Sequence, residues 1–226
     1  MSTNNVCWLA IETATRNCSV AVFKNEQCLA VVEEFDANKY IHAERLHSLV
    51  EVALSKAGKY FSDLQAILVG DGPGSYTGLR IGVSAAKGYA YALSLPLYAI
   101  SPLDALHAYW QEHGKDEDIC MSVIDARRME AFSKVFKKRQ APSEMQAIIF
   151  EEDTLRDDSN NIAIVGDAAS KLEGLYGKHV FLYPQHPSAA YYGQLGWNLI
   201  KDGQSVDMAY YAPNYGKEFS PGKPKS

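Results

Sequence analysis

The stretch VGDGPGSYTGLRIG, residues 69–82, decides how the rest of the chain is interpreted. The apolar residues 66–69 lead into it and predict a buried strand, and the alanine-rich residues 83–93 after it predict a helix. Four glycines between positions 70 and 78 permit tight turns and the close approach of a ligand or of another backbone segment. Phosphate groups bind at such strand-to-helix turns, on the free amides of the helix start. The stretch therefore predicts an α/β arrangement and leaves two uses for the loop, ligand contact or packing.

The glycine loop completes neither of the common nucleotide-binding motifs. A Walker loop needs a lysine, and none lies between Lys59 and Lys87. The dinucleotide motif also fails, because Ser75 and Thr77 stand where its third glycine is required. A weaker anion-binding nest stays open beside the alternative of a tight turn that only packs. The candidate nucleotide-proximal residues are Gly72, Gly74, Ser75 and Thr77.

Two predicted helices carry smooth faces suited to helix packing. In residues 76–93, small side chains recur every four positions and form one stripe. In residues 41–57, apolar side chains recur at steps of three and four. Such faces either pack within the domain or form half of an intermolecular four-helix bundle. The predicted interface residues are Ala43, Leu46, Leu49, Val50, Ala53, Gly78, Gly82, Ala86 and Ala90. Replacing Gly78 or Gly82 by leucine is expected to abolish pairing and leave the monomer folded.

Composition describes an ordinary globular protein and narrows its partners. The chain has 226 residues, of which 47% are hydrophobic and 22% are charged. Its net charge of −5 argues against a stand-alone nucleic-acid binder, because cationic groups normally neutralise the phosphates. No stretch approaches the roughly 18 uncharged apolar residues of a membrane span, and no secretion signal is evident. The four cysteines lack metal-type spacing, so a reducing cytoplasm is the expected location.

The order of predicted elements repeats along the chain. In the first half the predicted strands are 6–11, 18–23, 29–35, 66–69 and 97–100, and the helices are 41–57, 76–93 and one from Ser101-Pro102. In the second half the predicted strands are 119–124, 130–136, 145–150, 162–166 and 180–183, and the helices are 167–175 and 188–200. Each half approximates βββαβα, an order shared with actin, Hsp70 and sugar kinases.

This repetition predicts an α/β protein of two actin-like subdomains, each with a mixed sheet. Residues 1–104 form the N-terminal subdomain with the partner-binding helices, and residues 105–226 form the C-terminal subdomain with a polar tail. The last few residues of the segment 203–226 are expected to be mobile.

Several motifs together resemble one family. The opening hairpin residues 11–15 and 18–22, the helix start 42–46, the glycine segment 72–82, residues 101–106 and the second hairpin 125–130 carry the resemblance. They are similar to the TsaB (YeaZ) family of bacterial tRNA threonylcarbamoyladenosine biosynthesis subunits. The match is close through about residue 135, and Glu12 stands where the family usually has aspartate. The resemblance implies two ASKHA/RNase H-like subdomains and a cytoplasmic role.

The resemblance also implies how such a subunit works. It is non-catalytic and is required to form threonylcarbamoyladenosine at position 37 of ANN-decoding tRNAs. It pairs through its N-terminal helices with a TsaD-type paralogue, which carries the metal site, and a TsaE-type ATPase joins them. ATP or ADP and a metal ion belong to that complex rather than to this subunit alone, and tRNA is reached only through the complex. Without its partner the chain can form a homodimer through the same surface.

The residues themselves give weaker support for a catalytic metal site or for a kinase. His42 and His47 lie five positions apart, which separates them by roughly 140° around a helix, too far for one metal ion. An actin-like kinase needs acids at both hairpin turns and glycine beside the phosphates. The second turn has Asp125 but no glycine, and Asp125 and Glu130 are expected to pair with Arg127 or Arg128. An ATP-dependent small-molecule kinase of actin-like fold remains the alternative function.

Overall fold

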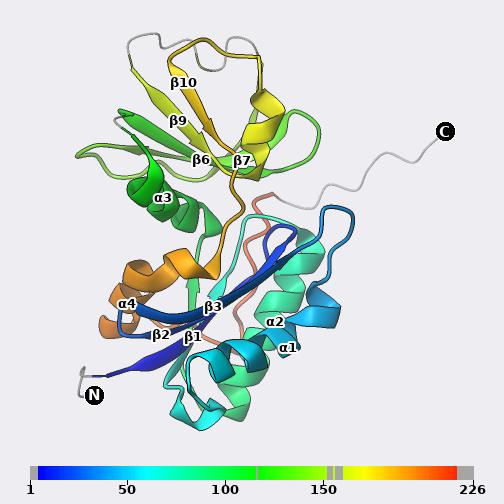
Figure 1. Ribbon diagram of the computed structural model, residues 1–226, viewed down its shortest axis with the longest axis vertical. Coiled ribbons are helices and arrows are strands. Elements are labelled where there is room, and N and C mark those ends of the chain that lie inside the picture. The colour runs from blue at the N-terminus through cyan, green and yellow to red at the C-terminus, as the bar shows by residue number, and fades with distance from the viewer. Residues whose placement is uncertain (1–4, 116, 152–154, 156–159, 218–226) are drawn as a thin grey trace, which may run out of the picture.

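Two lobes, each built on one five-stranded sheet, make up the protein (Figure 1). The computed structural model describes residues 5–115, 117–151, 155 and 160–217. The sheet orders are β3-β2-β1-β4-β5 and β10-β9-β6-β7-β8. In both sheets the first three strands along the chain pair antiparallel and the last two pair parallel. The predicted α/β fold with two mixed sheets is therefore confirmed.

The first lobe buries its central strands between two helical layers. Its elements are β1 (Cys7–Glu12), β2 (Asn17–Lys24), β3 (Gln27–Phe35), α1 (His42–Lys56), η1 (Phe61–Asp63), β4 (Ala66–Gly70), α2 (Tyr76–Ala92) and β5 (Leu97–Ile100). Every residue of β1 and β4 is buried, because helices lie on both faces of the sheet. Helices α1 and α2 share one core cluster with alternate residues of β1, β2 and β4.

The second lobe is smaller in its helical content. Its strands are β6 (Ile119–Asp125), β7 (Glu130–Lys137), β8 (Gln146–Ile149), β9 (Ile162–Val165) and β10 (Val180–Tyr183). The α-helix expected over residues 167–175 is wrong, since the chain forms only the 3₁₀ segment η2 (Asp167–Leu172) there. Gly166 and Gly174 bracket it with φ of 144° and 81°, and the space between them is too short for a stable α-helix.

Helix starts follow the sequence signals closely. The Ser75 hydroxyl accepts a hydrogen bond from the Gly78 amide (3.2 Å) at the start of α2. Ser101 does the same for the Leu103 amide (3.3 Å), and Pro102 opens α3 (Pro102–His113). These caps fix where the glycine loop ends and where the chain crosses to the second lobe.

After β10 the chain returns to the first lobe. The elements η3 (Ala189–Tyr192) and α4 (Gly193–Lys201) replace the single helix expected over residues 188–200. Tyr192 packs with Trp8 and Phe23 on the face of the first sheet opposite α1 and α2. The division of the chain at residues 104 and 105 stays a prediction, and the expected mobile end, residues 218–226, lies outside the described residues.

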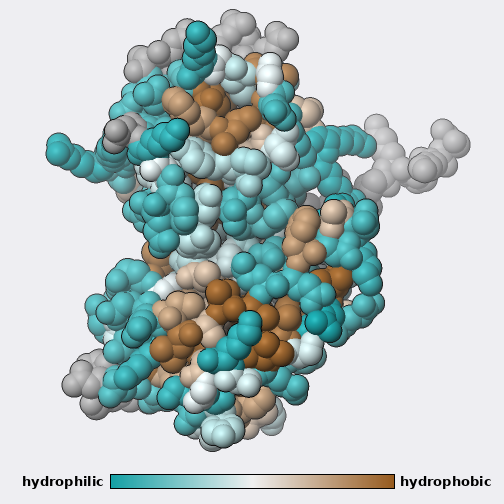
Figure 2. All heavy atoms as spheres, viewed as in Figure 1, coloured by the Kyte–Doolittle hydropathy of each residue, from teal (hydrophilic) through white to brown (hydrophobic). Residues whose placement is uncertain are grey.

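Surface character differs between the lobes and their junction. Figure 2 shows hydrophobic residues gathered on the first lobe over β2 and β3, whereas hydrophilic residues dominate where the lobes meet. On β3, Val31 and Phe35 are 37% and 50% exposed. Within the described part of the chain, none of the helices has the length and hydropathy of a membrane-spanning segment.

Candidate functional site

The glycine loop packs against the loop between β1 and β2. The Ser75 amide donates to the Ala14 carbonyl oxygen at 2.7 Å. A Cβ atom on Gly74 would lie 2.4 Å from that same oxygen. Gly72 has φ of +118°, and a Cβ there would lie 2.0 Å from the Asn214 carbonyl oxygen. Of the candidate nucleotide-proximal residues, Gly72, Gly74 and Ser75 therefore contact the protein itself, and Thr77 is exposed.

The small-residue stripe of α2 faces inward. A Cβ on Gly78 would lie 2.2 Å from the Thr13 carbonyl oxygen, and one on Gly82 would lie 2.1 Å from Thr13 Oγ1. Ala86 and Ala90 are fully buried in the core shared with α1. The structure contradicts the expectation that leucine at Gly78 or Gly82 leaves the monomer folded, because a Cβ would already overlap the Thr13 carbonyl oxygen at Gly78 and the Thr13 side chain at Gly82.

The apolar stripe of α1 also faces the protein's own core. Leu46, Val50 and Ala53 are fully buried, Leu49 is nearly so, and Ala43 is exposed. Eight of the nine predicted interface residues thus pack within the lobe, which was the alternative that the sequence left open. Docking of a partner on these two helices stays a prediction, and only residues beside the buried stripes can carry it.

The outer side of α2 offers such residues. We name the exposed residues Tyr76, Arg80, Ser84, Gly88 and Tyr91 the docking face. Tyr76 and Tyr91 are 54% and 78% exposed. The Arg80 guanidinium donates to the Tyr76 hydroxyl at 3.1 Å and lies 5.3 Å from its ring centre. A shallow hollow of about 360 Å³ lies between these side chains and Ser84.

Both carboxyl oxygens of Glu12 are hydrogen-bonded within the protein. Its side chain is fully buried at the end of β1, where the Tyr192 hydroxyl donates to Oε2 and the Ala14 amide donates to Oε1 at 2.5 Å. Gly70 on β4 leaves room for this group, since a Cβ there would lie 2.0 Å from Oε2. Burial raises the pKa of Glu12 to about 7.

Asp71, at the end of the neighbouring strand β4, is also bound by a tyrosine hydroxyl. It follows β4 directly, and the Tyr211 hydroxyl donates to its Oδ2. Its carbonyl oxygen accepts a hydrogen bond from the Asn214 amide at 2.8 Å. Burial raises the pKa of Asp71 above its ordinary value. Both acids near the glycine loop are therefore satisfied by tyrosines from the C-terminal part of the chain.

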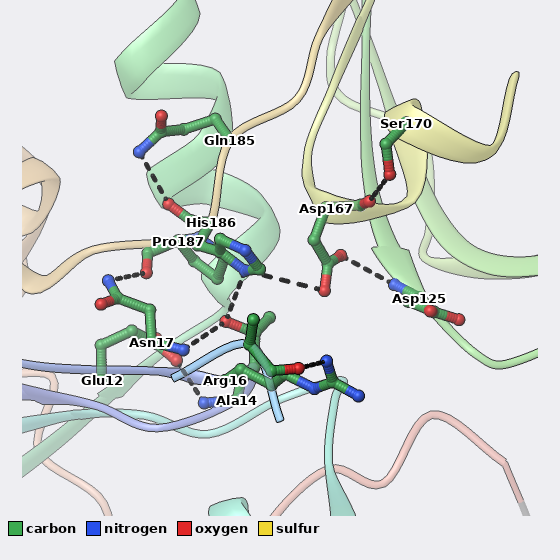
Figure 3. A network of polar contacts seen from close by, with 12 residues as sticks. Glu12, Ala14, Arg16, Asn17, Asp125, Asp167, Ser170, Gln185, His186 and Pro187 are labelled. Atoms are coloured by element: carbon green, nitrogen blue, oxygen red, sulfur yellow. Dashed lines mark hydrogen bonds and ion pairs between the residues drawn. The ribbon is translucent and has the colours of Figure 1, made fainter. Parts of the chain in front are cut away.

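A second group of polar contacts joins the lobes (Figure 3). His186 Nδ1 lies 3.2 Å from Thr15 Oγ1 in the first lobe and 3.9 Å from Asp167 Oδ2 in the second. The Asp125 amide donates to Asp167 Oδ1 at 2.9 Å. Burial raises the pKa of Asp167 to about 6, and burial together with the charge of Arg16 lowers the pKa of His186. The junction thus places Asp167 beside a histidine that burial keeps neutral.

The second hairpin pairs differently from the expectation. Asp125 pairs with Lys171, and Glu130 pairs with Lys217. The predicted pairing with arginine side chains is wrong: the Arg127 backbone amide donates to Asp125 Oδ1, whereas Arg127 and Arg128 form a tight turn with φ of 75° and 53° and exposed side chains. Lys171 also donates to the Arg128 carbonyl oxygen at 2.7 Å. The two lysines come from distant parts of the chain, so local sequence could not reveal them.

The histidines of α1 have structural partners. His42 is fully buried, with Nε2 2.7 Å from the Thr15 carbonyl oxygen. His47 lies at the surface, with Nδ1 2.6 Å from the Tyr89 hydroxyl, and so links α1 to α2. Across the described residues, no group of three or more His, Cys, Asp or Glu side chains is placed to hold a metal ion.

Sequence reasoning missed the residues that complete this site. The partners of the acids lie 46 to 180 positions away from them along the chain, and they are Tyr192, Tyr211, Asn214, Lys171 and Lys217. No periodic pattern or spaced motif marks them. Only a three-dimensional arrangement could identify them as partners of the acids.

Comparison with known proteins places this geometry in a family. The family model of TsaD, tRNA N6-adenosine threonylcarbamoyltransferase, matches residues 37–173, which include the glycine loop and the second hairpin. The chain belongs to this family. An uncharacterized protein of Mycobacterium tuberculosis is 36% identical over 55% of this chain and 56% of its own length. The tRNA threonylcarbamoyladenosine biosynthesis protein TsaB of Escherichia coli is 34% identical over 55% of this chain and 52% of its own length.

A solved structure extends the likeness over most of the chain. YeaZ from Pseudomonas aeruginosa has a TM-score of 0.78 and is 26% identical, over 93% of this chain and 99% of that one. The resemblance to the TsaB (YeaZ) family is therefore confirmed. In sequence, by contrast, the match spans only about half the length of the curated relatives, 56% for the mycobacterial protein.

Proposed function

We propose that this chain is a non-catalytic partner subunit in the formation of threonylcarbamoyladenosine at position 37 of ANN-decoding tRNAs. It acts by pairing with a TsaD-type catalytic subunit. Relatives named for tRNA threonylcarbamoyladenosine biosynthesis support the pathway, and the match to the transferase family supports the pairing of paralogues. The observation that carries the non-catalytic role is the use of Glu12 and Asp71 as structural acids, each bound by a tyrosine hydroxyl.

The same observation disfavours a small-molecule kinase. Phosphoryl transfer in actin-like folds needs carboxylates that are free to hold magnesium and a glycine loop open to the phosphates. Here Glu12 is enclosed by Tyr192 and Gly70, and Asn214 covers Gly72. A nucleotide at this loop would first have to displace parts of the chain itself. ATP or ADP and a metal ion are therefore assigned to the partner complex.

The docking face is the surface proposed for the partner. It presents two exposed tyrosines and small residues along one side of α2, next to the exposed side of α1. The bond between His47 and Tyr89 holds the two helices together, so the partner meets a rigid pair. Two further helices from the partner would complete a four-helix bundle. The same face serves a homodimer when the chain is alone.

The wider assembly follows from this pairing. A TsaE-type ATPase joins the heterodimer, and tRNA is bound through the complex rather than by this chain, whose net charge is −5. The complex works in the cytoplasm.

Reconstituted tRNA modification tests this function. The remaining components are incubated with ANN-decoding tRNA, with and without this chain, and modified adenosine is measured. We expect product only when the chain is present and no turnover by the chain alone. Equal product without the chain would contradict the proposal. Magnesium-dependent nucleotide binding by the isolated chain, with phosphorylation of a small molecule, would favour the kinase instead.

A further inference from the structure

The C-terminal segment 204–217, named here the strap, is anchored firmly to the first lobe. The Val206 amide donates to the Leu97 carbonyl oxygen at 2.9 Å. Further along, Tyr211 and Asn214 hold the side chain and the carbonyl oxygen of Asp71. Figure 1 shows this last coloured segment running along the first lobe towards the second. The strap thus lies against the end of β4, where the glycine loop begins.

The far end of the strap reaches the second lobe. Lys217 pairs with Glu130, the first residue of β7. Gly216 has φ of +74°, and a Cβ there would lie 2.6 Å from the Phe132 ring of β7 and 2.9 Å from Pro73 of the glycine loop. Gly216 is therefore enclosed between a residue of each lobe. Only a residue without a side chain fits there in this backbone conformation.

Two other chain crossings connect the lobes elsewhere. One lies between β5 and α3 at Ser101, and the other lies between β10 and η3, around His186. Two crossings define an axis about which lobes can rotate, as in hinge motions of two-part proteins. Near these crossings α3 also packs on η3, through Tyr109 and Tyr191. The strap adds a separate point of attachment, at the start of β7, where the second hairpin meets the glycine loop. A separate attachment away from the crossings opposes rotation of the lobes about them.

We propose that the strap is a clasp that fixes the second lobe in its orientation relative to the first. The two ends of the clasp differ in strength. Tyr211 bonds to an acid that is largely enclosed, whereas Lys217 and Glu130 form a partly exposed ion pair. Exposed ion pairs are weak and screened by salt. The clasp therefore opens at its Lys217 end, and this device operates without any docked protein.

Spin labels on the two lobes of the full-length chain test the clasp. Ser55→Cys on α1 and Glu173→Cys after η2 provide exposed labelling sites, and Cys28→Ser removes the exposed natural thiol. Distances between the labels are measured by double electron–electron resonance. Gly216→Val wedges the strap away from Phe132. Gly203→Val is the matched control, because Gly203 also has positive φ, +67°, but a Cβ there meets nothing within 4 Å.

The clasp predicts one narrow distance distribution in the parent protein and a broadened or shifted one in Gly216→Val. The Gly203→Val control should keep the parent distribution. Circular dichroism checks folding, and if Gly216→Val does not fold, Lys217→Ala takes its place with a smaller broadening expected. Unchanged distances in the folded clasp variant would overturn the proposal. Equal broadening in Gly203→Val would also overturn it, since strain alone would then suffice.

Discussion

Each lobe has one acid at the end of its first strand, β1 or β6, and another shortly after the fourth strand, β4 or β9, yet the surroundings of the two pairs differ. In the first lobe Glu12 is fully buried and Asp71 is half-buried, and each receives a tyrosine hydroxyl. In the second lobe, Asp125 is partly exposed and pairs with Lys171. Asp167 accepts a backbone amide and faces His186. The same order of strands thus gives acids bound by tyrosines in one lobe and acids bound by a lysine and a backbone amide in the other. The helices packed beside each pair of acids make this difference.

The difference arises from what covers each hairpin. In the first lobe, the glycine stripe of α2 lets that helix lie directly on Thr13, and η3 closes the other side. In the second lobe, only the short η2 follows β9, and the turn at Arg127 and Arg128 remains at the surface. The first lobe has therefore become a rigid platform. The second is attached through polar contacts at His186 and Lys217 and through apolar packing of α3, whose Ala105 lies in the core cluster of the first lobe.

The largest expected effect breaks the enclosed hairpin. Gly82→Leu should lower the free energy of unfolding by about 3 kcal/mol or more, because the new side chain collides with Thr13. Gly88→Leu, on the same helix, meets nothing within 4 Å and should gain up to about 1 kcal/mol from helix propensity. Urea unfolding measures both. Similar losses in the two variants would show that α2 is not packed as described.

A smaller effect tests the tyrosine bound to Glu12. Tyr192→Phe should cost about 1–3 kcal/mol, since it leaves a buried carboxyl oxygen without its donor. Tyr210→Phe is the control, because Tyr210 is 89% exposed and should change stability by less than about 0.5 kcal/mol. Thermal and urea unfolding compare the two. Unchanged stability in Tyr192→Phe would contradict the claim that Glu12 in the first lobe depends on this tyrosine hydroxyl.

The pH dependence of stability follows from the raised pKa values. The pKa of Glu12 rises from 4.5 to about 7, and that of Asp167 rises from 3.8 to about 6. Between its ordinary and its raised pKa, each of these two carboxyl groups binds more protons in the folded state than in the unfolded state. Its contribution to stability therefore falls as pH rises. The contribution of Glu12 to the free energy of unfolding, measured as the difference between the parent chain and Glu12→Gln, should therefore decline from about pH 4.5 to about pH 7. A difference that stays constant over this range would contradict the burial of Glu12.

The smallest expected effect lies in the exposed hairpin. Arg128→Gly should stabilise the protein by up to about 1 kcal/mol, because glycine adopts the left-handed conformation without strain. The Arg128 carbonyl oxygen still accepts the bond from Lys171. A clear loss of stability in urea would mean that the arginine side chain contributes to the fold.

Local patterns predicted the strands and α-helices of the first lobe, including the helix start at Ser101 and Pro102, because periodicity and capping act within a few residues. The same patterns could not decide which way a smooth stripe faces. A stripe of small residues looks alike whether a partner helix or Thr13 lies against it. The partners of the acids were beyond reach for a related reason, since Tyr192 lies 180 positions from Glu12. In the second lobe, Gly166 and Gly174 cut short a helix that composition favoured.

The docking face carries the central claim, and one binding measurement tests it most directly. Sedimentation velocity with a TsaD-type subunit compares the parent chain with Gly88→Leu, which places a bulky side chain on the outer side of α2 without touching the core. The account predicts a folded monomer whose affinity for the partner falls about tenfold or more, equivalent to about 1.4 kcal/mol or more. Undiminished pairing by the folded variant would contradict it.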